Sequence, residues 1–328
     1  MNLIEFKNLH TSFYTDNGVV HAVNGVNFSI PEGSTLAVVG ESGSGKSVTA
    51  LSLMGLLPRP IGRIDEGEIL YQGKNILDMD PVERRKLRSR DLAMIFQEPM
   101  TSLNPALKVG FQIEEVYRRI MGLSKEEAKK KTIEMLEMVE IEGAANKAKS
   151  YPHELSGGQR QRVMIAIALA SSPKLLIADE PTTALDVTIQ KEVLELMDDL
   201  KRDLNTSIML ITHDLGVVAQ MADDVVVMYG GRVMEKSDVC TIFDNPMHPY
   251  TKGLLRARPT LENRGEKLYN IPGNVPPPSE MEGHCPFYSR CESRMDRCKE
   301  EVPKLRAQYP GHCVACFLYE GESCEKIT

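Results

Sequence analysis

An octapeptide with three glycines restricts the possible folds of this chain more than any other feature. Gly40-Glu41-Ser42-Gly43-Ser44-Gly45-Lys46-Ser47 matches the pattern G-x-x-x-x-G-K-[ST] and directly follows the apolar run Leu36–Val39. This pattern works between a β-strand and a helix: the glycines let backbone N–H groups surround phosphate oxygens, and the helix points its positive end at them. The sequence therefore predicts a strand, a phosphate-binding loop and a helix, in that order.

Two side chains of this loop have predicted roles. Lys46 would reach the β- and γ-phosphates of a nucleotide, and Ser47 would ligate Mg²⁺. The other residues expected to bind the nucleotide here are Gly40, Glu41, Ser42, Gly43, Ser44, Gly45 and Val48.

Further short apolar runs follow along the first 230 residues, with helical patterns between them. The runs are Leu36–Val39, Leu92–Phe96, Leu175–Ala178, Ile208–Thr212 and Val225–Tyr229. Several are continuous rather than alternating, as in strands that are covered on both faces. Among the helical segments, Ser124 and Glu127 are spaced as a capping box. Alternation of this kind favours an α/β fold with a largely parallel core.

We therefore expect a P-loop NTPase-type fold with a mostly parallel core sheet, an antiparallel β part, an inserted α-helical subdomain and a small Cys-rich C-terminal extension. The nucleotide-binding domain would span residues 1–258, with the helical subdomain at about 98–170. The extension, 259–328, would contain a Pro-rich arm at Ile271–Pro278 and a tail too short to build a core of its own.

Polar residues stand where several predicted strands end. Asp179 and Glu180 follow one strand; Asp179 would act on Mg²⁺, and Glu180 could polarise an attacking water as general base. His213, after the next strand, would contact the γ-phosphate or orient the water. Gln97, after Leu92–Phe96, could sense both Mg²⁺ and the water. In a doubly wound sheet such positions are expected to meet in one crevice.

Composition excludes other classes of function. The net charge is −7 without a dominant basic block, which argues against nucleic acid as a partner. The N-terminal residues do not form a signal peptide, and no apolar run reaches the length of about 20 residues that a membrane span needs. We expect a soluble or peripheral protein. Six of the seven cysteines fall between Cys285 and Cys324, a clustering that favours metal binding over disulfides in a reducing compartment.

The pentapeptide Leu155-Ser156-Gly157-Gly158-Gln159 completes a set of motifs. Together with the phosphate loop, Gln97, the Asp179-Glu180 pair, the Ala184-Leu185-Asp186 turn and His213, it resembles the ATP-binding cassette (ABC) family over about Asn2 to Tyr250.

The resemblance implies a mechanism. Two cassettes would stack head to tail, with each ATP held between the phosphate loop of one cassette and the pentapeptide at 155–159, the signature, of the other. Ser156, Gly157, Gly158 and Gln159 would thus serve the partner's γ-phosphate. Asp186 would couple the two sites. Adenine would stack on Phe13, with Tyr14 as its neighbour. The catalytic set would be Glu180, His213 and Gln97, with Ser47 and Gln97 on Mg²⁺.

Two C-terminal segments, Asn245–Thr251 and Ile271–Pro278, resemble the oligopeptide/dipeptide importer branch of that family. This implies an ATPase that docks on two membrane permease subunits at the cytoplasmic face of the membrane, together with a second cassette that is a paralogue or a copy. An extracytoplasmic solute-binding protein would deliver the substrate. An importer of nickel or another small solute is an alternative, as is a non-transport cassette ATPase acting on DNA or ribosomes.

The cysteine spacing leaves the metal open. Cys313 and Cys316 form a C-x₂-C pair compatible with zinc, and ferredoxin-type spacing is absent. Members of the family with a similar tail hold a 4Fe–4S cluster on four thiolates, and that resemblance implies Cys285, Cys291, Cys298 and Cys316 as ligands, with Cys313 spare. Zinc and unmetallated thiols remain alternatives.

Overall fold

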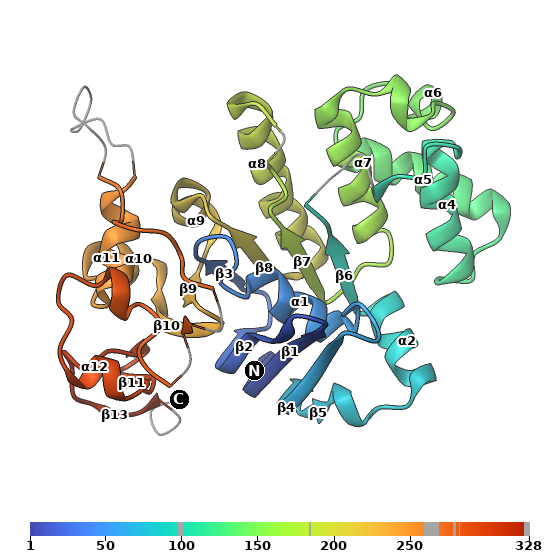
Figure 1. The fold of residues 1–328 in the computed structure, drawn as a ribbon. Coiled ribbons are helices and arrows are strands. Elements are labelled where there is room, and N and C mark those ends of the chain that lie inside the picture. The colour runs from blue at the N-terminus through green and yellow to red at the C-terminus, as the bar shows by residue number, and fades with distance from the viewer. Residues whose placement is uncertain (98–101, 184, 259–268, 278–279, 282, 325–328) are drawn as a thin grey trace. The chain divides into compact units, whose positions relative to one another are not determined.

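The computed structural model describes residues 1–97, 102–183, 185–258, 269–277, 280–281 and 283–324 (Figure 1). The expected start of the helical subdomain, Ala184 of the predicted turn and the start of the extension at 259–268 lie outside these residues. The chain divides into two compact units. Unit 1 comprises residues 1–30, 35–77 and 211–328, and unit 2 comprises 31–34 and 78–210. The predicted domain boundary at residue 258 stays a prediction.

Unit 1 contains an antiparallel sheet that begins at the N-terminus. The strand order is β2 (Gly18–Pro31), β1 (Asn2–Thr15), β4 (Gly62–Tyr71) and β5 (Lys74–Asn75). Ile4 and Phe6 of β1 are buried, whereas Lys7 is exposed, as expected for a strand with one covered face. This sheet is the predicted antiparallel β part.

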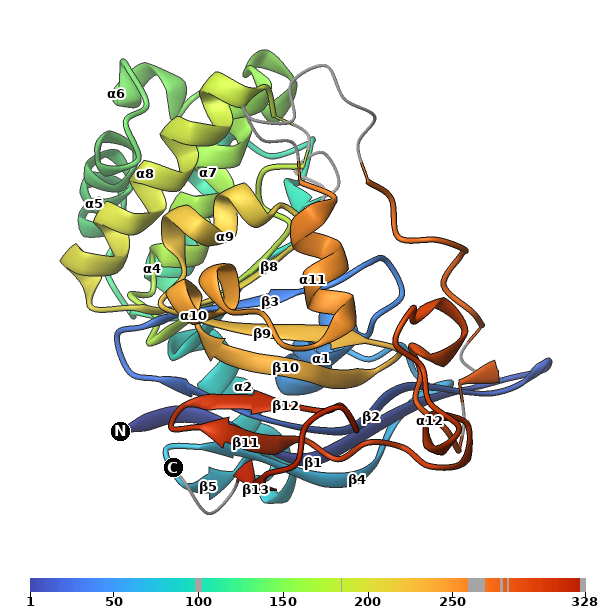
Figure 2. The same ribbon diagram turned by 90° about the vertical axis from the view of Figure 1, so that its left-hand side faces the viewer.

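A second run of strands carries the phosphate loop. Its order within unit 1 is β13 (Glu322–Ser323), β11 (Arg306–Tyr309), β12 (His312–Val314), β10 (Arg232–Asp238), β9 (Asp224–Tyr229) and β3 (Thr35–Val39). β3 and β9 are parallel, and β3 is buried along its whole length. β10 is antiparallel to both β9 and β12, so strands of the C-terminal extension continue the order beyond β10 (Figure 2). The helices of unit 1 are α1 (Lys46–Met54), α9 (Leu215–Met221), α10 (Val239–Asp244), α11 (Pro249–Arg256), η4 (Tyr288–Arg290) and α12 (Arg297–Glu300).

Apolar residues of the extension join the core of the strands and helices that precede it. Ile271, Phe287 and Cys298 pack in one apolar cluster with Val227 and Tyr229 of β9 and Tyr250 of α11. A short tail that cannot bury enough apolar surface alone gains it here by packing against β9 and α11.

Unit 2 contains the parallel pair β6 (Leu92–Ile95) and β7 (Leu175–Asp179) and a group of helices whose colours in Figure 1 run from cyan (α2) through green to yellow (α8). β8 (Ser207–Thr212) begins in this unit, and its last two residues belong to unit 1. The helices are α2 (Pro81–Arg90), α4 (Val109–Arg119), α5 (Lys125–Met138), α6 (Ala144–Lys147), η2 (Pro152–Glu154), α7 (Gly157–Leu169) and α8 (Val187–Leu204), and η1 (Ile76–Asp78) spans the boundary with unit 1.

The α/β fold class is confirmed, and each predicted apolar run forms a strand. The capping box is confirmed too: the Ser124 side chain accepts from the Glu127 N–H, and Glu127 accepts from the Ser124 N–H. The disulfide Cys313–Cys324 differs from the prediction that clustered cysteines favour metal binding over disulfides. It packs in a small cluster with Ala307, whose strand β11 lies next to β12.

A buried carboxylate joins the extension to β10. Glu235, with 0% exposure, accepts hydrogen bonds from the backbone N–H groups of Met247 (2.7 Å) and His248 (2.9 Å) and from His312 Nε2 (2.8 Å). Burial would raise the pKa of Glu235, but these hydrogen bonds outweigh burial and lower its pKa below the usual value. A buried charge satisfied in this way is costly to remove.

We expect Glu235→Gln to lower the free energy of unfolding by about 2–4 kcal/mol at neutral pH, because two backbone donors and His312 lose a charged acceptor. Since the pKa of Glu235 is lowered in the folded state, its contribution is present above the unfolded-state pKa and is lost as the pH falls through the folded-state value. The difference between wild type and variant should therefore shrink in acid. Urea unfolding checks this.

The matched control is Glu195→Gln on α8, where the carboxylate is half exposed and pairs with Lys191. It should change the stability by less than about 0.5 kcal/mol. Equal losses in the two variants would contradict the assignment.

Candidate functional site

The phosphate loop, between β3 and α1, takes a shape that only glycine permits at two positions. Gly40 has φ of +152°, and a Cβ there would lie 2.2 Å from the Met228 carbonyl oxygen. Gly45, the N-cap of α1, has φ of +96°, and its Cβ would lie 2.6 Å from the Ala22 carbonyl oxygen. The loop is thus packed between backbone of β9 and β2, which fixes its path and leads it into the N-terminus of α1.

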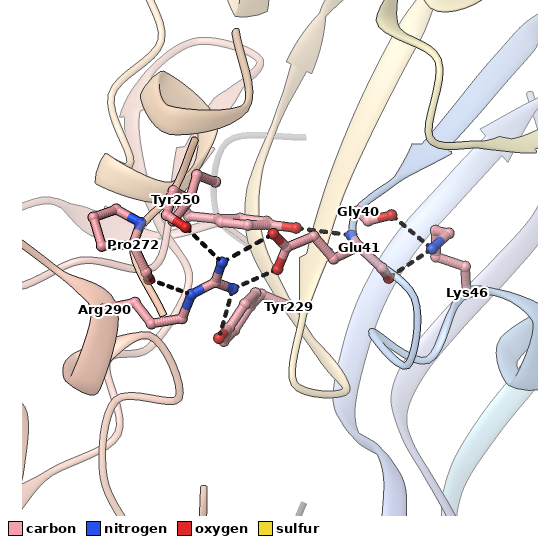
Figure 3. Close-up of polar contacts among 8 residues, drawn as sticks. Gly40, Glu41, Lys46, Tyr229, Tyr250, Pro272 and Arg290 are labelled. Atoms are coloured by element: carbon pink, nitrogen blue, oxygen red, sulfur yellow. Dashed lines mark hydrogen bonds and ion pairs between the residues drawn. The ribbon is translucent and has the colours of Figure 1, made fainter. Parts of the chain in front are cut away.

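Lys46 is the most enclosed charge of the loop, with 6% exposure. Its Nζ donates to the carbonyl oxygens of Gly40 (2.7 Å) and Glu41 (2.9 Å) (Figure 3). It also donates to Ser44 Oγ (3.2 Å). The ammonium is therefore held within the loop. Ser47 and Val48 follow in the first turn of α1 and are half-buried, whereas Ser42 and Gly43 are exposed.

Gln97 and Glu180 meet within unit 2. Because β6 and β7 are parallel and Ile95 pairs with Ala178, the residue two positions beyond each partner lies at the same edge. Gln97 Nε2 donates to Glu180 Oε2 at 2.9 Å, and Thr183 Oγ1 donates to the same oxygen at 2.8 Å. The expected meeting of these two strand-end residues is observed.

The backbone of Glu180 is strained. Its φ is +48°, a left-handed conformation that non-glycine residues seldom adopt. Such strain persists only where the surroundings enforce it, and it clusters at active sites. The carboxylate is half-buried, and Asp179 beside it is buried with 7% exposure. An oriented, partly enclosed carboxylate is suited to accept a proton from water.

The Leu155–Gln159 segment starts helix α7. Ser156 is the N-cap: its side chain accepts from the Gln159 N–H and the Gln159 side chain accepts from the Ser156 N–H, both at 3.3 Å. The two glycines differ. A Cβ on Gly157 would meet nothing within 4 Å, whereas a Cβ on Gly158 would lie 2.7 Å from Ile189 Cγ2 of α8. Gly158 allows close helix packing, and Gly157 leaves the helix N-terminus open to an incoming group.

The remaining predicted residues lie at element ends. Asp186 is the N-cap of α8 and accepts from the Thr188 and Ile189 N–H groups at 3.1 and 3.0 Å. In unit 1, His213 is exposed at the end of β8, and Asp214 caps α9. Their predicted roles toward a nucleotide stay predictions.

The two aromatic candidates for adenine differ in exposure. Phe13 is half-buried and pairs across the sheet with Gly62, where a Cβ would lie 3.1 Å from its ring. Tyr14 is 41% exposed, its hydroxyl donates to Asp65 at 3.0 Å, and the Arg63 guanidinium lies over its ring. Which of them would stack on adenine stays a prediction.

Four of the free cysteines of the described residues line one cavity. These are Cys285, Cys291, Cys298 and Cys316, with His248 and Phe287 among the other lining residues. Burial raises the pKa of Cys285 to about 12 and of Cys316 to about 11, so these thiols are neutral unless a cation stabilises the thiolates. Cys313 is in the disulfide instead, and Cys240 is an exposed free thiol.

No group of three or more His, Cys, Asp and Glu side chains in the described residues is arranged to hold a single metal ion. A single zinc ion needs its thiolates about 2.3 Å from one point, whereas an iron–sulfur cluster binds thiolates spread around a larger body. Thiolates are ligands for both kinds of site.

Sequence reasoning missed a contact between the extension and the phosphate loop. Both terminal nitrogens of Arg290 bind the Glu41 carboxylate, and the Tyr250 hydroxyl accepts from the Glu41 N–H at 2.8 Å. The sequence carries no local signal for this contact, since Arg290 and Glu41 are 249 positions apart.

Comparison with known proteins places these features in a family. A family model described as "ABC transporter" matches residues 23–183, and one described as "Oligopeptide/dipeptide transporter, C-terminal region" matches 234–298. The oligopeptide transport ATP-binding protein AppD of Bacillus subtilis is 51% identical over 324 residues, which cover 99% of each chain. The chain belongs to the ABC transporter family. The predicted resemblance is thus confirmed, including the C-terminal branch.

The chain is also similar to other members of the family. The oligopeptide transport ATP-binding protein OppD of Salmonella typhimurium is 50% identical over 315 residues, 96% of this chain and 93% of that protein. A dimeric post-hydrolysis structure of the ATP-binding cassette MJ0796 bound to ADP and Pi has a TM-score of 0.64 at 31% identity and covers 72% of this chain and 98% of the cassette. Among the helices of the described residues, none has the length and apolar character to cross a membrane.

We expect Gly158→Ala to lower the free energy of unfolding by about 1–3 kcal/mol, because the new methyl group overpacks against Ile189. Gly157→Ala, the matched control one residue earlier, should leave stability unchanged or raise it by up to about 1 kcal/mol, since alanine favours the helix and meets open space. Denaturant unfolding of both variants measures the difference. Adding Ile189→Ala should restore part of the loss in Gly158→Ala; no restoration would contradict the packing role.

Proposed function

We propose that this chain is the ATP-hydrolysing energy-coupling subunit of a membrane importer for dipeptides or oligopeptides. The observation that carries the ATPase assignment is the Glu180 carboxylate, held on strained backbone and hydrogen-bonded by Gln97. The substrate class rests on the relatives. Several of them are named oligopeptide transport ATP-binding proteins, and this chain matches them over nearly their whole length.

In this proposal the two ends of the nucleotide are bound by different residues. The phosphate loop binds the β- and γ-phosphates through its N–H groups and Lys46, and Phe13 or Tyr14 stacks on adenine. Glu180 accepts the proton of the attacking water, and His213 donates to the γ-phosphate.

The polar residues present suit a magnesium ion. Ser47 would supply its hydroxyl, Gln97 its amide oxygen and Asp179 a carboxylate, all oxygen ligands of the kind magnesium prefers. Gln97 donates to Glu180 through Nε2, which leaves its Oε1 as the atom able to face a cation. The ion would neutralise charge on the phosphates.

The signature serves a second cassette. Ser156 and the open N-terminus at Gly157 would bind the γ-phosphate held by a partner cassette, and Gln159 would stay with its cap. ATP then favours the closed pair over the open one, and hydrolysis removes that preference. Asp186 would transmit the change between the two sites. Dimeric structures of the related cassette MJ0796 support such an assembly.

Further partners follow from the importer assignment. The chain would dock at the cytoplasmic face of the membrane on two permease subunits, and an extracytoplasmic binding protein would deliver the peptide. The match of residues 234–298 to the oligopeptide/dipeptide C-terminal region supports this over a cassette acting on DNA or ribosomes. No contact among the described residues favours nickel as the substrate over a peptide.

We also propose that Cys285, Cys291, Cys298 and Cys316 hold a 4Fe–4S cluster. Their common cavity, and the separation of Cys313 in its disulfide, support the set that contains Cys316. Such a cluster would bring redox-active iron, or a structural link, to a segment with little core of its own.

Glu180→Gln should leave Mg-ATP affinity within about threefold of wild type and reduce hydrolysis in the assembled transporter by at least about 10²-fold, the lower range for a lost general base. The amide of the variant has nearly the same shape as the carboxylate that it replaces, so nucleotide binding through the phosphate loop should be unaffected. The exposed Glu195→Gln on α8 is the matched control and should hydrolyse normally. Unchanged turnover in Glu180→Gln would remove Glu180 as the base.

Protein purified without oxygen should be brown and contain iron and sulfide. Cys298→Ser or Cys316→Ser should lose the iron, because a cubane needs four ligands. Cys240→Ser and Cys313→Ser should keep it. A colourless protein with stoichiometric zinc, or iron that survives Cys316→Ser, would overturn the assignment.

A further inference from the structure

The C-terminal extension binds the phosphate loop directly. Arg290 Nη2 donates to Glu41 Oε1 at 3.1 Å, and Nη1 donates to Glu41 Oε2, so the guanidinium and the carboxylate meet as two forks (Figure 3). This bidentate geometry is the strongest and most directional ion pair that side chains make. Glu41 is the second residue of the loop whose N–H groups would bind phosphate.

Arg290 is itself held in place. Its side chain is 5% exposed; Nε donates to the Pro272 carbonyl oxygen at 3.0 Å, and Nη1 also donates to the Tyr229 hydroxyl at 3.3 Å. Its position is therefore set jointly by Pro272 of the extension and Tyr229 of β9, and a shift of the extension would act on Glu41 through this ion pair.

A second contact acts on the same loop residue. The Tyr250 hydroxyl accepts from the Glu41 N–H at 2.8 Å, and the Tyr250 ring packs on Phe287 with centroids 5.3 Å apart. Glu41 is thus fixed at its side chain by Arg290 and at its backbone by Tyr250.

Both contacts lead to the four-cysteine cavity. Arg290 precedes Cys291 in the chain, and the Arg290 N–H donates to the Phe287 carbonyl oxygen at 3.1 Å. Phe287 and Cys291 both line the cavity. One path from a thiol to the phosphate loop therefore runs from Cys291 through the peptide bond to Arg290 and then through the ion pair to Glu41. A second path runs through the packed rings of Phe287 and Tyr250.

We propose that the four-cysteine centre and the phosphate loop are coupled through Arg290, a positioning residue, so that an intact centre strengthens nucleotide binding. The inference rests on the proposed function, because it assumes that the loop binds ATP. Coupling between two sites is reciprocal, so bound nucleotide must also stabilise what the centre holds. The extension would then regulate the ATPase rather than merely extend it.

The test is a double-mutant cycle on the dissociation constant of Mg-ATP, measured by calorimetry on the full chain. Cys291→Ser perturbs the centre whatever it holds, and Arg290→Gln removes the fork. In the wild-type background Cys291→Ser should weaken binding at least about fivefold, the lower end of typical coupling. In the Arg290→Gln background the same change should alter binding less than about twofold, because the path is already cut.

Two further measurements keep the outcome interpretable. Arg306→Gln, which removes an exposed hydrogen bond to the Gly321 carbonyl oxygen in the same extension, should leave the effect of Cys291→Ser at full size. In wild type, Mg-ATP should slow the loss of bound metal to a chelator, and in Arg290→Gln it should not. Circular dichroism confirms that each variant is folded.

Either of two results overturns the coupling: Cys291→Ser leaves the Mg-ATP dissociation constant of the otherwise wild-type chain unchanged, or it weakens Mg-ATP binding equally with and without Arg290. Its failure is distinct from that of the proposed function. Loss of Mg-ATP binding in wild type would refute the ATPase, and absence of metal in wild type would refute the cluster but leave the cycle readable.

Discussion

The absence of room for a side chain at Gly40 is the constraint on which the rest of unit 1 depends. A Cβ there would lie 2.2 Å from the Met228 carbonyl oxygen, and one at Gly45 would lie 2.6 Å from that of Ala22. The phosphate loop is thus shaped by backbone of β9 and β2 rather than by its own residues alone. Lys46 adds to this shape by donating to the carbonyl oxygens of Gly40 and Glu41. Because the loop is packed against these strands, a displacement of β9 or β2 would also displace the loop.

That property gives the C-terminal extension a physical route to the loop. Glu235 ties the extension to β10 through His312, and Arg290 ties it to Glu41. The Glu235–His312 pair is buried, and a buried charge loses its partner at high cost. In the second pair Arg290 is buried and Glu41 is half-buried. The extension is therefore integrated with the strand run that carries the phosphate loop, and its Cys285, Cys291 and Cys298 belong to the same apolar cluster as Tyr229 and Tyr250.

The sequence predicts the elements and the strand-end residues well, because these follow from local patterns. Continuous apolar runs such as Leu175–Ala178 predict covered strands, and parallel pairing then brings Gln97 to Glu180. The Ser124–Glu127 capping box is likewise local. Contacts between distant segments leave no such pattern. Arg290 could be any surface arginine in the sequence, and nothing in the spacing of Cys313 and Cys324 selects that pair from the other cysteines. The left-handed backbone conformation of Glu180 is also not predictable from the sequence, since glutamate does not favour that conformation.

In the proposed function, Ser156 serves an ATP bound by another cassette. Photolabelling of the assembled transporter with an ATP analogue reactive at its γ-phosphate tests it most directly, with this chain carrying Lys46→Ala so that it binds no nucleotide of its own. We expect peptide 155–159 of this chain to be labelled still, from the nucleotide of the partner cassette. Loss of that label in Lys46→Ala, with the partner's nucleotide still bound, would contradict it.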